Sequence, residues 1–480
     1  MIGRATVLAG LGGLLLLGLA PEGLAQDLAA GRERIESLAF PPLEFDPPRP
    51  TLHEVAGGVR VLHLEDATLP VVDVIVRFKG GYARFPRDSY AAATALPMLV
   101  RNGGTRRLQP DSIDALIELY ALQMVFGGGG EGIFSSLSVL RDQLPVGLEL
   151  WGELMREPGF DADQVEVWRG RELDNTRRLR DDPGILAYST FNRIMYGDHP
   201  IGWELGPDDL EPSDLAPEKL RSLHQRLFCR ETMVIGVTGD VRWDELEPLL
   251  LGMLAEWPAC AEPLPPPRIP EIRTGGGVFL IPHDLNQSTV VMAHASDVRQ
   301  DDGDAYFASR IGNAILGASG FGSRLMARVR TEEGYAYAAS SLWTAPRRGQ
   351  GLVGAVTQTR SETTLSAIRA LLDVMEEMRR TAPTSDEVLR NVQDYANGFV
   401  FNFQSPDQIV SRQTLYLLNE FPDDWLERYL EGIQEVSETD VLEAFRTHVH
   451  PEDMVILVLG DPDGFEESLE ALGPVTVLER

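Results

Sequence analysis

The stretch "ETMVIGVTGD", Glu231 to Asp240, occurs a second time in this chain as "EDMVILVLGD", Glu452 to Asp461. Both copies carry Glu, Met-Val-Ile, Val and Gly-Asp in the same register, 221 residues apart. Each copy reads as a strand that ends on Gly-Asp. Because a repeat determines the architecture of the whole chain, it is considered before any motif.

A second pair of segments matches at nearly the same offset of 219 residues. These are "GGVRVLHLEDATLPVVDVIV" (Gly57 to Val76) and "GGVFLIPHDLNQSTVVMAHA" (Gly276 to Ala295). Each consists of an apolar run, a polar break and a second apolar run, a pattern that predicts a hairpin. Two matches in the same order indicate a tandem duplication of one unit.

The boundary between the copies is predicted from "WPACAEPLPPPRIPEIRTGGG", Trp257 to Gly277. Its prolines favour an extended, semi-rigid connection. The predicted organisation is therefore a first domain over residues 26–262, a proline-rich linker over 263–274 and a second domain over 275–480.

Strands and helices are segregated within each copy. Apolar residues recur at helical spacing in 112–123 and 144–156 of the first copy and in 362–380 of the second. Thr384 or Ser385 supplies the N-cap of a further helix, with acidic residues in its first turn. This order predicts the α+β class, an antiparallel sheet covered by helices on one face.

The bulk composition is that of a soluble globular protein, with 43% hydrophobic and 24% charged residues over 480 positions. The length favours two or more domains. The net charge of −30 repels phosphate backbones and anionic membranes, so nucleic acid is not expected as a partner.

The first 25 residues resemble a secretory signal peptide. Arg4 gives a short positive region, Ala5 to Ala20 is apolar, and small residues precede a cleavage site after Ala25. The apolar run is shorter than a membrane span usually requires. A periplasmic or secreted location without an integral membrane segment is predicted for the mature chain. Cys229 and Cys260 could pair there or remain free thiols, and the sequence leaves both open.

Four stretches in the right order carry a family resemblance that spans most of the mature chain. They are "RNGGTRRL" from Arg101, "DHPIGWELGPDDL" from Asp198, "VIGVTGDV" from Val234 and "GFGSRLMARVRTEEGYAYAASS" from Gly320. The chain resembles the M16 metallopeptidases, which include the insulin-degrading and mitochondrial processing peptidases. The resemblance implies two tandem repeats of the LuxS/MPP-like metallohydrolase fold.

Active M16 enzymes hold zinc with an inverted His-x-x-Glu-His on a helix of the first copy, followed by Gly-Thr. Two His one turn apart supply ligands, and the Glu polarises the attacking water. Gly104-Thr105 sets the register in this chain. The two His positions then hold Ala95 and Leu99, and the Glu position holds Met98, so we expect this helix to have become part of the core.

The family's third ligand is a Glu on a later helix, and its position falls on Asn175, eight residues before Pro183. Glu172 lies one turn away, but without the two His it has no metal to complete. His448 and His450 are close-spaced, and a structural role is favoured for them, as it is for His199. We therefore predict no catalytic residue, no metal site and no cofactor in this chain.

The second copy retains Arg330 and Tyr337, seven residues apart. In the family, an Arg and a Tyr at this place hold the backbone of the substrate near the scissile bond. A guanidinium and a phenol both donate hydrogen bonds to a peptide carbonyl. The resemblance thus implies substrate binding by Arg330 and Tyr337. The structural alternative is that Arg330 forms a surface ion pair with Glu332 or Glu333, and that Tyr337 is an ordinary aromatic residue of a strand.

Glycines mark two further stretches. Gly317, Gly320 and Gly322 lie where the non-catalytic subunit of the mitochondrial processing peptidase has a glycine-rich loop tied to substrate recognition, and a tight turn is the alternative. The run Gly127–Gly130 falls where the family has an edge strand that can pair with an extended peptide. It could leave room for a partner chain or form a flexible loop.

Two functional hypotheses follow. In the first, the chain is a non-catalytic, substrate-binding subunit of a heterodimer whose partner, an active M16 subunit with His-x-x-Glu-His, carries the zinc. In the second, it is an M16-like scaffold or peptide-binding protein, alone or as a homodimer, with no role in proteolysis. An enzyme with a relocated site stays open as a third, because a spatial triad is not visible in sequence. The peptide substrate is not identified by the sequence.

Overall fold

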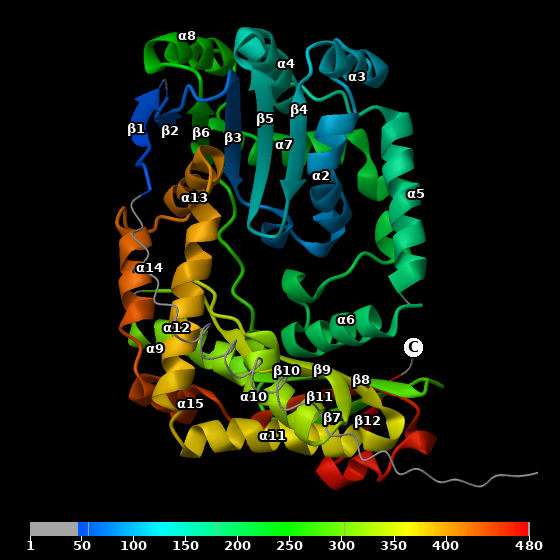
Figure 1. Ribbon diagram of the computed structural model, residues 1–480. Helices are drawn as coiled ribbons and strands as arrows, with labels where there is room; N and C mark the ends of the chain where they lie inside the picture. Colours follow the sequence, from blue (N-terminus) through cyan, green and yellow to red (C-terminus); the bar gives the residue numbers. More distant parts are fainter. Residues whose placement is uncertain (1–46, 56, 180, 302, 479–480) are drawn as a thin grey trace, which may run out of the picture. The chain divides into compact units, whose positions relative to one another are not determined.

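Two six-stranded sheets form the centre of the fold (Figure 1). Five strands follow the same order in each, whereas one edge strand is the first strand of the chain in the first sheet and the last in the second. The computed structural model describes residues 47–478 apart from 56, 180 and 302, so the predicted signal peptide lies outside the described residues. The first sheet runs β1-β2-β6-β3-β5-β4, formed by Thr51–Val55, Val59–Glu65, Met233–Gly239, Val71–Lys79, Gly132–Leu140 and Gln123–Gly128.

The second sheet repeats the shared order of five strands with strands from the second copy. It runs β12-β7-β11-β8-β10-β9, formed by Val475–Val477, Gly277–Pro282, Val455–Gly460, Gln287–Ser296, Gly351–Arg360 and Ala336–Trp343. The duplicated stretches that end on Gly239 and Gly460 are the equivalent strands β6 and β11. In both sheets this repeated strand is buried along its whole length.

The predicted hairpins are wrong in both copies. The two runs of Gly57 to Val76 do form the strands β2 and β3, but β6 is inserted between them, parallel to β2 and antiparallel to β3. In the second copy β11 separates β7 from β8 in the same way. Both sheets are consequently mixed rather than purely antiparallel. The insertion places the most apolar strand of each copy in the middle, where both of its faces are covered.

The predicted helices are present. The helix 144–156 has the expected bounds, that expected over 362–380 begins at Thr364, and that expected over 112–123 is shifted at both ends. The helix expected over 112–123 ends at Leu119, because Ala121 adopts a left-handed conformation (φ 51°) that turns the chain into β4. Thr384 is the N-cap of the later helix and accepts a hydrogen bond from the backbone N–H of Glu387. The helices of the first copy are α2 Tyr90–Asn102, α3 Pro110–Leu119, α4 Leu144–Arg156, α5 Ala162–Leu179, α6 Pro183–Tyr196, α7 Pro217–Leu227 and α8 Trp243–Leu254. Those of the second are α9 Asp304–Asn313, α10 Arg324–Met326, α11 Thr364–Arg380, α12 Ser385–Val400, α13 Pro406–Leu418, α14 Trp425–Gln434 and α15 Glu438–His448.

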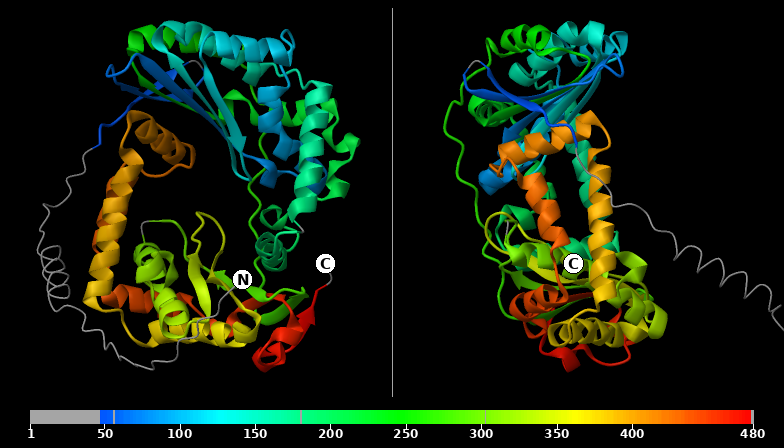
Figure 2. Two further views of the ribbon diagram at one scale, coloured as in Figure 1. Left: turned by 45° about the vertical axis from the view of Figure 1, so that its right-hand side comes forward. Right: turned by 60° about the vertical axis from the view of Figure 1, so that its left-hand side comes forward.

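The two copies exchange one helix. The equivalent helices α6 and α13 each pack on the sheet of the other copy, α6 on β8 and β11 and α13 on β2, β3 and β6 (Figures 1 and 2). The core under α6 contains Ala187, Phe191 and Met195 together with residues of the second sheet. The prediction of one covered face per sheet is therefore incomplete, because part of the second face is covered by the exchanged helix.

A glycine in β6 allows the close approach of α13. A Cβ atom at Gly236 would lie 2.5 Å from Cγ1 of Val410 and 2.7 Å from Cγ2 of Thr414. Arg77 on β3 reinforces the contact, since its guanidinium donates to Oγ1 of Thr414 and to both oxygens of Ser411. A hydrogen-bonded, closely packed crossing of this kind ties the second copy to the first.

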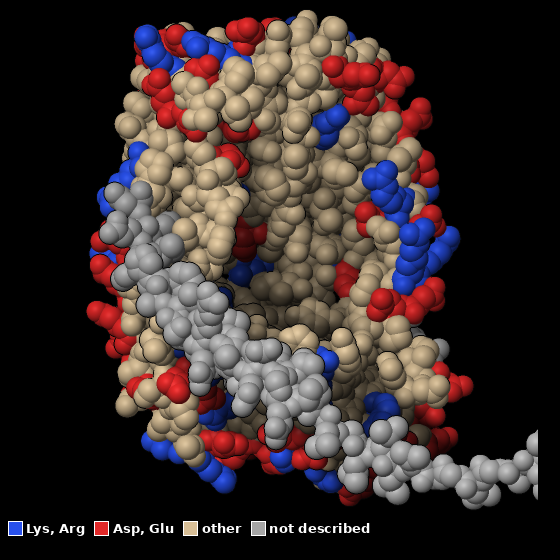
Figure 3. All heavy atoms as spheres, viewed as in Figure 1, with Lys and Arg blue, Asp and Glu red and all other residues tan. Residues whose placement is uncertain are grey.

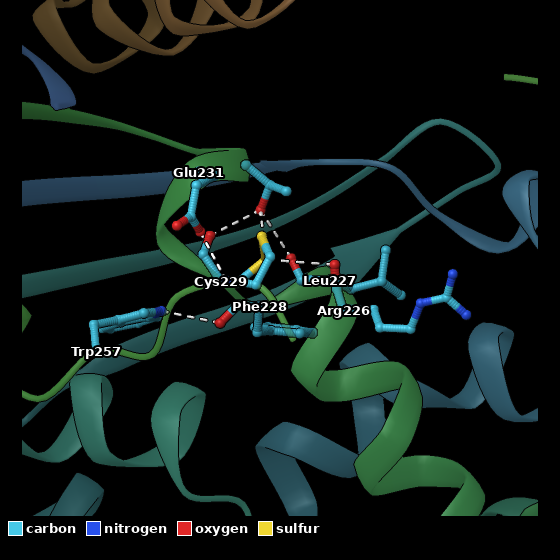
Figure 4. The surroundings of a disulfide bond; sticks show 8 residues. Arg226, Leu227, Phe228, Cys229, Glu231 and Trp257 are labelled. Carbon is cyan, nitrogen blue, oxygen red and sulfur yellow. Dashed lines mark hydrogen bonds between the residues drawn. A yellow bond between two sulfur atoms is a disulfide. The ribbon is translucent and has the colours of Figure 1, made fainter. Parts of the chain in front are cut away.

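A disulfide fixes the start of the connection between the copies (Figure 4). Cys229, after α7, is bonded to Cys260, 31 residues further on, which answers the question that the sequence left open. Nearby, Nε1 of Trp257 donates to the carbonyl of Phe228 over 3.0 Å. No helix or strand lies between Leu254 and Gly277.

Among residues 47–478, apart from the three positions left undescribed, no helix combines the length and the apolar character that a membrane crossing requires.

Candidate functional site

Helix α2, which the resemblance assigns to the place of the family's metal helix, is built as part of the first core. Ala95 and Leu99, one turn apart, have relative exposures of 0% and 1% and lie in the cluster around β3 and β5. Neither side chain has an atom that could bind a metal ion. Met98 lies on the outer side of the same helix and is 38% exposed. The expectation that all three residues became core is therefore wrong for Met98, because the buried face of the helix extends from Ala95 and Leu99 toward Leu96 and Val100, away from Met98.

Asn175, at the position of the third ligand, lies exposed on α5. Its Nδ2 donates to Oε2 of Glu172 over 3.3 Å. The carboxylate that lies one turn from the ligand position is therefore hydrogen-bonded to the amide that occupies it. Within the described part of the chain, the one cluster of three ligating side chains comprises Cys229, Glu231 and Cys260. Both of its sulfur atoms belong to the disulfide, and a disulfide sulfur is not the thiolate that binds a metal.

The Gly104-Thr105 turn, which set the register of α2 in the sequence, is held by the buried carboxylate of Glu153. Oγ1 of Thr105 donates to Oε1 of Glu153 over 2.7 Å, and Arg107 binds the same carboxylate. Burial raises the pKa of Glu153, but the hydrogen bonds from Arg107 and Thr105 outweigh it, so the pKa lies below the usual value. Thr105 also accepts from the backbone N–H groups of Arg107 and Leu108. The Gly-Thr turn thus retains a structural role although the metal ligands are absent.

The structure brings Arg330 and Tyr337 together. The guanidinium of Arg330 lies 4.5 Å from the ring centre of Tyr337 and 4.6 Å from that of Phe321, within the range of a cation–π contact on both sides. Both rings are largely exposed, Tyr337 by 78% and Phe321 by 75%. Phe321 was not predicted from the sequence. The feature that distinguishes it there is that a large apolar residue lies between two glycines.

Arg330 has no acceptor in the described part of the chain. Its Nη1 atom is buried without a hydrogen-bond partner. The surface ion pair considered from the sequence is made by Arg328 instead, which contacts Glu332 and Glu333. An unpaired buried donor costs about 1–3 kcal/mol, and such a group is available to a ligand that carries an acceptor.

The local fold explains how residues seven positions apart meet. After α10 the chain makes a wide π-helical turn, Ala327–Glu332, which ends near Gly334 in a left-handed conformation (φ 64°). The chain then reverses into β9, an edge strand, where Tyr337 points outward. Arg324 anchors the start of this segment through a two-bond contact with Glu387 at the beginning of α12. The hydrogen bond from Arg324 is the largest cause that lowers the pKa of Glu387 to about 2.

The three glycines before this segment differ in their structural roles. A Cβ atom at Gly317 would lie 2.4 Å from the backbone nitrogen of Ser341, so only glycine fits there. Gly320 has a left-handed conformation (φ 71°), and Gly322 has open space around it. Gly317 therefore serves close packing against β9, whereas Gly320 shapes the turn that presents Phe321. A binding role for the three remains a prediction.

The glycine run of the first copy forms the β4–β5 turn and packs closely. A Cβ atom at Gly81 would lie 1.9 Å from the carbonyl oxygen of Gly129, and one at Gly127 would lie 2.7 Å from the ring of Phe134. The backbone N–H of Gly129 donates to the carbonyl of Gly132 over 2.9 Å. Gly127, at the end of the edge strand β4, is thus required by its neighbour Phe134, whereas Gly129 in the turn has open space around its Cβ position.

The histidines singled out from the sequence have structural hydrogen bonds. Nε2 of His199 contacts the carbonyl of Arg268, and its Nδ1 accepts from the backbone N–H of Ile201. His448 contacts Asp297 through Nδ1, and the backbone N–H of His450 donates to Nε2 of His294. These contacts fit the structural roles that the sequence favoured.

A cavity with a volume of about 1380 Å³ is lined by side chains from both copies. Figure 3 shows a hollow on this face of the molecule. The lining includes Tyr82 and Arg84 of the first copy, the linker around Arg268, and residues of α9, α12, α13 and α14. Neither Ala95 nor Arg330 belongs to it, so this cavity is a second candidate site.

Comparison with known proteins shows which sequences and structures this chain is similar to. Residues 214–394 match the family model described as the peptidase M16 inactive domain. An uncharacterized zinc protease of Streptomyces coelicolor is 24% identical over 315 residues, which make up 64% of this chain and 68% of that protein. The non-peptidase homolog YmxG of Helicobacter pylori is 20% identical over 417 residues, 84% of this chain and 92% of that protein.

The fold has close counterparts among solved structures. A crystal structure of a peptidase M16 inactive domain from Pseudomonas fluorescens superposes with a TM-score of 0.75 at 24% identity, and covers 86% of this chain and 98% of that chain. The resemblance to the M16 family and the α+β fold that it implied are thereby confirmed.

Proposed function

We propose that this M16-like chain, which carries the family's inactive domain, is the non-catalytic, substrate-binding subunit of a zinc peptidase heterodimer. A partner subunit with His-x-x-Glu-His supplies the metal and the general base. This chain supplies Arg330 and Tyr337, which hold the backbone of a peptide.

One contrast between the copies carries the proposal. The family's ligand positions Ala95 and Leu99 are buried and apolar, whereas Arg330 and Tyr337 stand in contact at the edge of the second sheet. Loss of the metal ligands alone is expected of any family member that has lost its catalytic activity. Retention of a donor pair, half-buried Arg330 and exposed Tyr337, together with that loss supports a chain that binds peptide without cutting it.

The chemistry of the pair suits a peptide backbone. The guanidinium of Arg330 lies within cation–π distance of the rings of Phe321 and Tyr337, and its Nη1 has no hydrogen-bond partner among the described residues. A peptide carbonyl would accept from the N–H groups of this guanidinium and from the Tyr337 hydroxyl. Neither contact depends on the side chains of the peptide, as a peptidase subunit with several substrates requires.

A periplasmic or secreted location is part of the proposal. The disulfide between Cys229 and Cys260 supports it, since structural disulfides persist in oxidising compartments and are rare in the cytosol. The apolar run of residues 5–20 is its second support.

The experiment is a native purification of the tagged chain from its own cell envelope, followed by mass spectrometry. We expect a homologous chain with His-x-x-Glu-His in near-equal amount, and a metal-dependent peptidase activity in the complex. Replacing Arg330 with Ala in that complex should reduce peptide cleavage while the partner still co-purifies.

The alternative is a scaffold or peptide-binding protein without a role in proteolysis. The similarity to a non-peptidase homolog over 84% of the chain favours it. Recovery of this chain alone, as a monomer or a homodimer, would support that function and contradict the heterodimer.

A further inference from the structure

The large cavity has the opposite charge balance from the chain as a whole. The chain has 43 basic and 73 acidic residues, whereas the cavity lining has more basic than acidic side chains. The acidic ones are Glu131 and Asp394; the basic ones are Lys79, Arg84, Arg268, Arg310, Arg347, Arg348 and Arg412. A cationic site in a strongly acidic protein is a local arrangement that the average composition does not explain.

Most of these arginines have no carboxylate partner among residues 47–478 that the structure describes. Arg84 is paired with Glu131, and Lys79 with Glu420. The guanidinium of Arg412 donates to the amide oxygen of Asn402, and that of Arg268 to the backbone carbonyl of Asp198. The charges of these two arginines are thus hydrogen-bonded but not neutralised.

Arg310, Arg347 and Arg348 form no ion pair with a carboxylate among the described residues, although Arg310 is hydrogen-bonded to the phenol of Tyr429. Nε of Arg310 is buried without an acceptor, and its guanidinium lies 5.6 Å from the ring centre of Tyr395. Arg347 lies 3.7 Å from the ring centre of Phe421. Burial lowers the pKa of Arg347, and the neighbouring Arg348 lowers it further. Glu420 and Asp301 act in the opposite sense on Arg347, but Glu420 is already bonded to Lys79.

The lining also includes a group of aromatic side chains. Tyr306, Tyr395, Tyr416 and Tyr429 come from α9, α12, α13 and α14, and Trp425 adds an indole. Burial raises the pKa of Tyr306 to about 12, so its phenol remains a donor at any physiological pH. Guanidinium and phenol groups provide hydrogen-bond donors to an anion, while the ring faces can pack against apolar groups.

The size of the cavity points to a chain molecule rather than a metabolite. Pockets for drug-sized ligands have volumes of about 300–1,000 Å³, and this cavity of about 1380 Å³ is larger. The net charge of −30 opposes a nucleic acid, whose binding requires a broad basic surface. A short acidic peptide provides both the carboxylates and the apolar side chains that the lining can receive.

We propose that this cavity binds an acidic segment of peptide, with Arg310, Arg347, Arg348 and Arg412 as the donors to its carboxylates. The inference rests on the proposed function as a peptide-binding subunit and adds the class of peptide. Arg330 and Tyr337 bind the backbone of the peptide at one place, and the cavity binds the acidic side chains of the peptide at another.

The test uses the full chain and three labelled peptides of equal length, with Asp and Glu, with Asn and Gln, or with Lys at the same positions. Fluorescence anisotropy should give an affinity for the acidic peptide about tenfold or more above that for the neutral one. This preference should decrease with added salt, because partly exposed charges are screened.

The variant is Arg347→Gln with Arg348→Gln, since both side chains are exposed on the β9–β10 loop and their replacement leaves the core intact. It should lower the affinity for the acidic peptide about tenfold and leave that for the neutral peptide unchanged. The matched control is Arg221→Gln, a half-exposed arginine on α7 outside the cavity, which should bind all three peptides as the unmodified chain does.

The outcomes separate the two proposals. Equal affinity for the three peptides, or an acidic preference that survives the double variant, would overturn the cavity as the acidic site while leaving peptide binding intact. If none of the peptides bound, the proposed function itself would be contradicted and the inference with it.

Discussion

The guanidinium of Arg330 lies 4.5 Å from the ring centre of Tyr337, although the turn around Gly334 separates the two residues along the chain. The contact joins the end of a π-helical turn to an edge strand. With Phe321 on the other side, it holds the guanidinium in one orientation without a carboxylate. An arginine that is oriented but not neutralised is suited to bind a ligand.

Replacement of either member of this pair should weaken peptide binding. For Arg330→Gln and Tyr337→Phe we expect a loss of up to about tenfold each, because a net hydrogen bond contributes about 0.5–1.5 kcal/mol. Thermal stability should stay nearly unchanged, since Tyr337 is exposed. Titration calorimetry with an extended peptide measures both variants. An unchanged affinity would favour the scaffold function, and Arg328→Gln is the matched control on the same turn.

The chain should carry no tightly bound zinc. Ala95 and Leu99 have no ligand atoms, and Asn175 is bonded to Glu172 on the surface. Metal analysis of the purified chain should find far less than one zinc per molecule, and a chelator should leave the melting temperature unchanged. One equivalent of zinc that resists dialysis would show that the ligand positions were wrongly assigned.

An alanine at Gly236 should loosen the exchange of helices. The added methyl group would overlap Val410 and Thr414 on α13, and overpacking of this kind costs about 1–3 kcal/mol. The melting temperature of Gly236→Ala should therefore decrease, and Val410→Ala in the same chain should restore part of it. Gly252→Ala is the control, because a Cβ atom there meets nothing within 4 Å and helix α8 gains in propensity.

Removal of the disulfide should lower stability. The bond closes a loop of 31 residues, for which the loss of chain entropy in the unfolded state corresponds to about 3–4 kcal/mol. Cys229→Ser with Cys260→Ser should unfold at a lower denaturant concentration than the unmodified chain. Under reducing conditions the two should unfold alike; a difference that persisted there would mean that packing, not the bond, is responsible.

The free energy of unfolding should decrease as the pH falls through the range in which histidine side chains take up a proton. Burial lowers the pKa of His224 to about 4, while the unfolded chain has a value near 6.5. Below pH about 6.5 the unfolded chain takes up a proton that the folded one does not, so about 3 kcal/mol is lost by pH about 4. Denaturant unfolding across this range measures the slope.

The variant His224→Gln should reduce that slope. Glutamine keeps an N–H donor for the carbonyl of Met155, which Nε2 of His224 contacts over 2.7 Å, but does not titrate. Part of the slope should remain, because burial also lowers the pKa of His294. An identical slope in the variant would show that His224 does not contribute.

Local patterns were reliable where the structure depends on local contacts. The helix 144–156 has the predicted bounds, and Thr384 caps α12, because periodicity and capping act within a few residues. The hairpin prediction failed because a turn between two apolar runs does not say whether a third strand enters between them. Met98 was assigned to the core from its apolar character, although its place on α2 directs it outward.

The sequence by itself determined the duplication, the M16 resemblance, the absence of ligand atoms at Ala95 and Leu99, and the amide in place of a carboxylate at Asn175. These depend on residue identity and register along the chain. Only the tertiary structure decided that α6 and α13 exchange sheets, that Phe321 completes the contact of Arg330 and Tyr337, and that arginines from several elements line one cavity. The physical reason is that these arrangements arise from packing between segments distant in the chain, where the interaction partners leave no periodic signal in either segment alone.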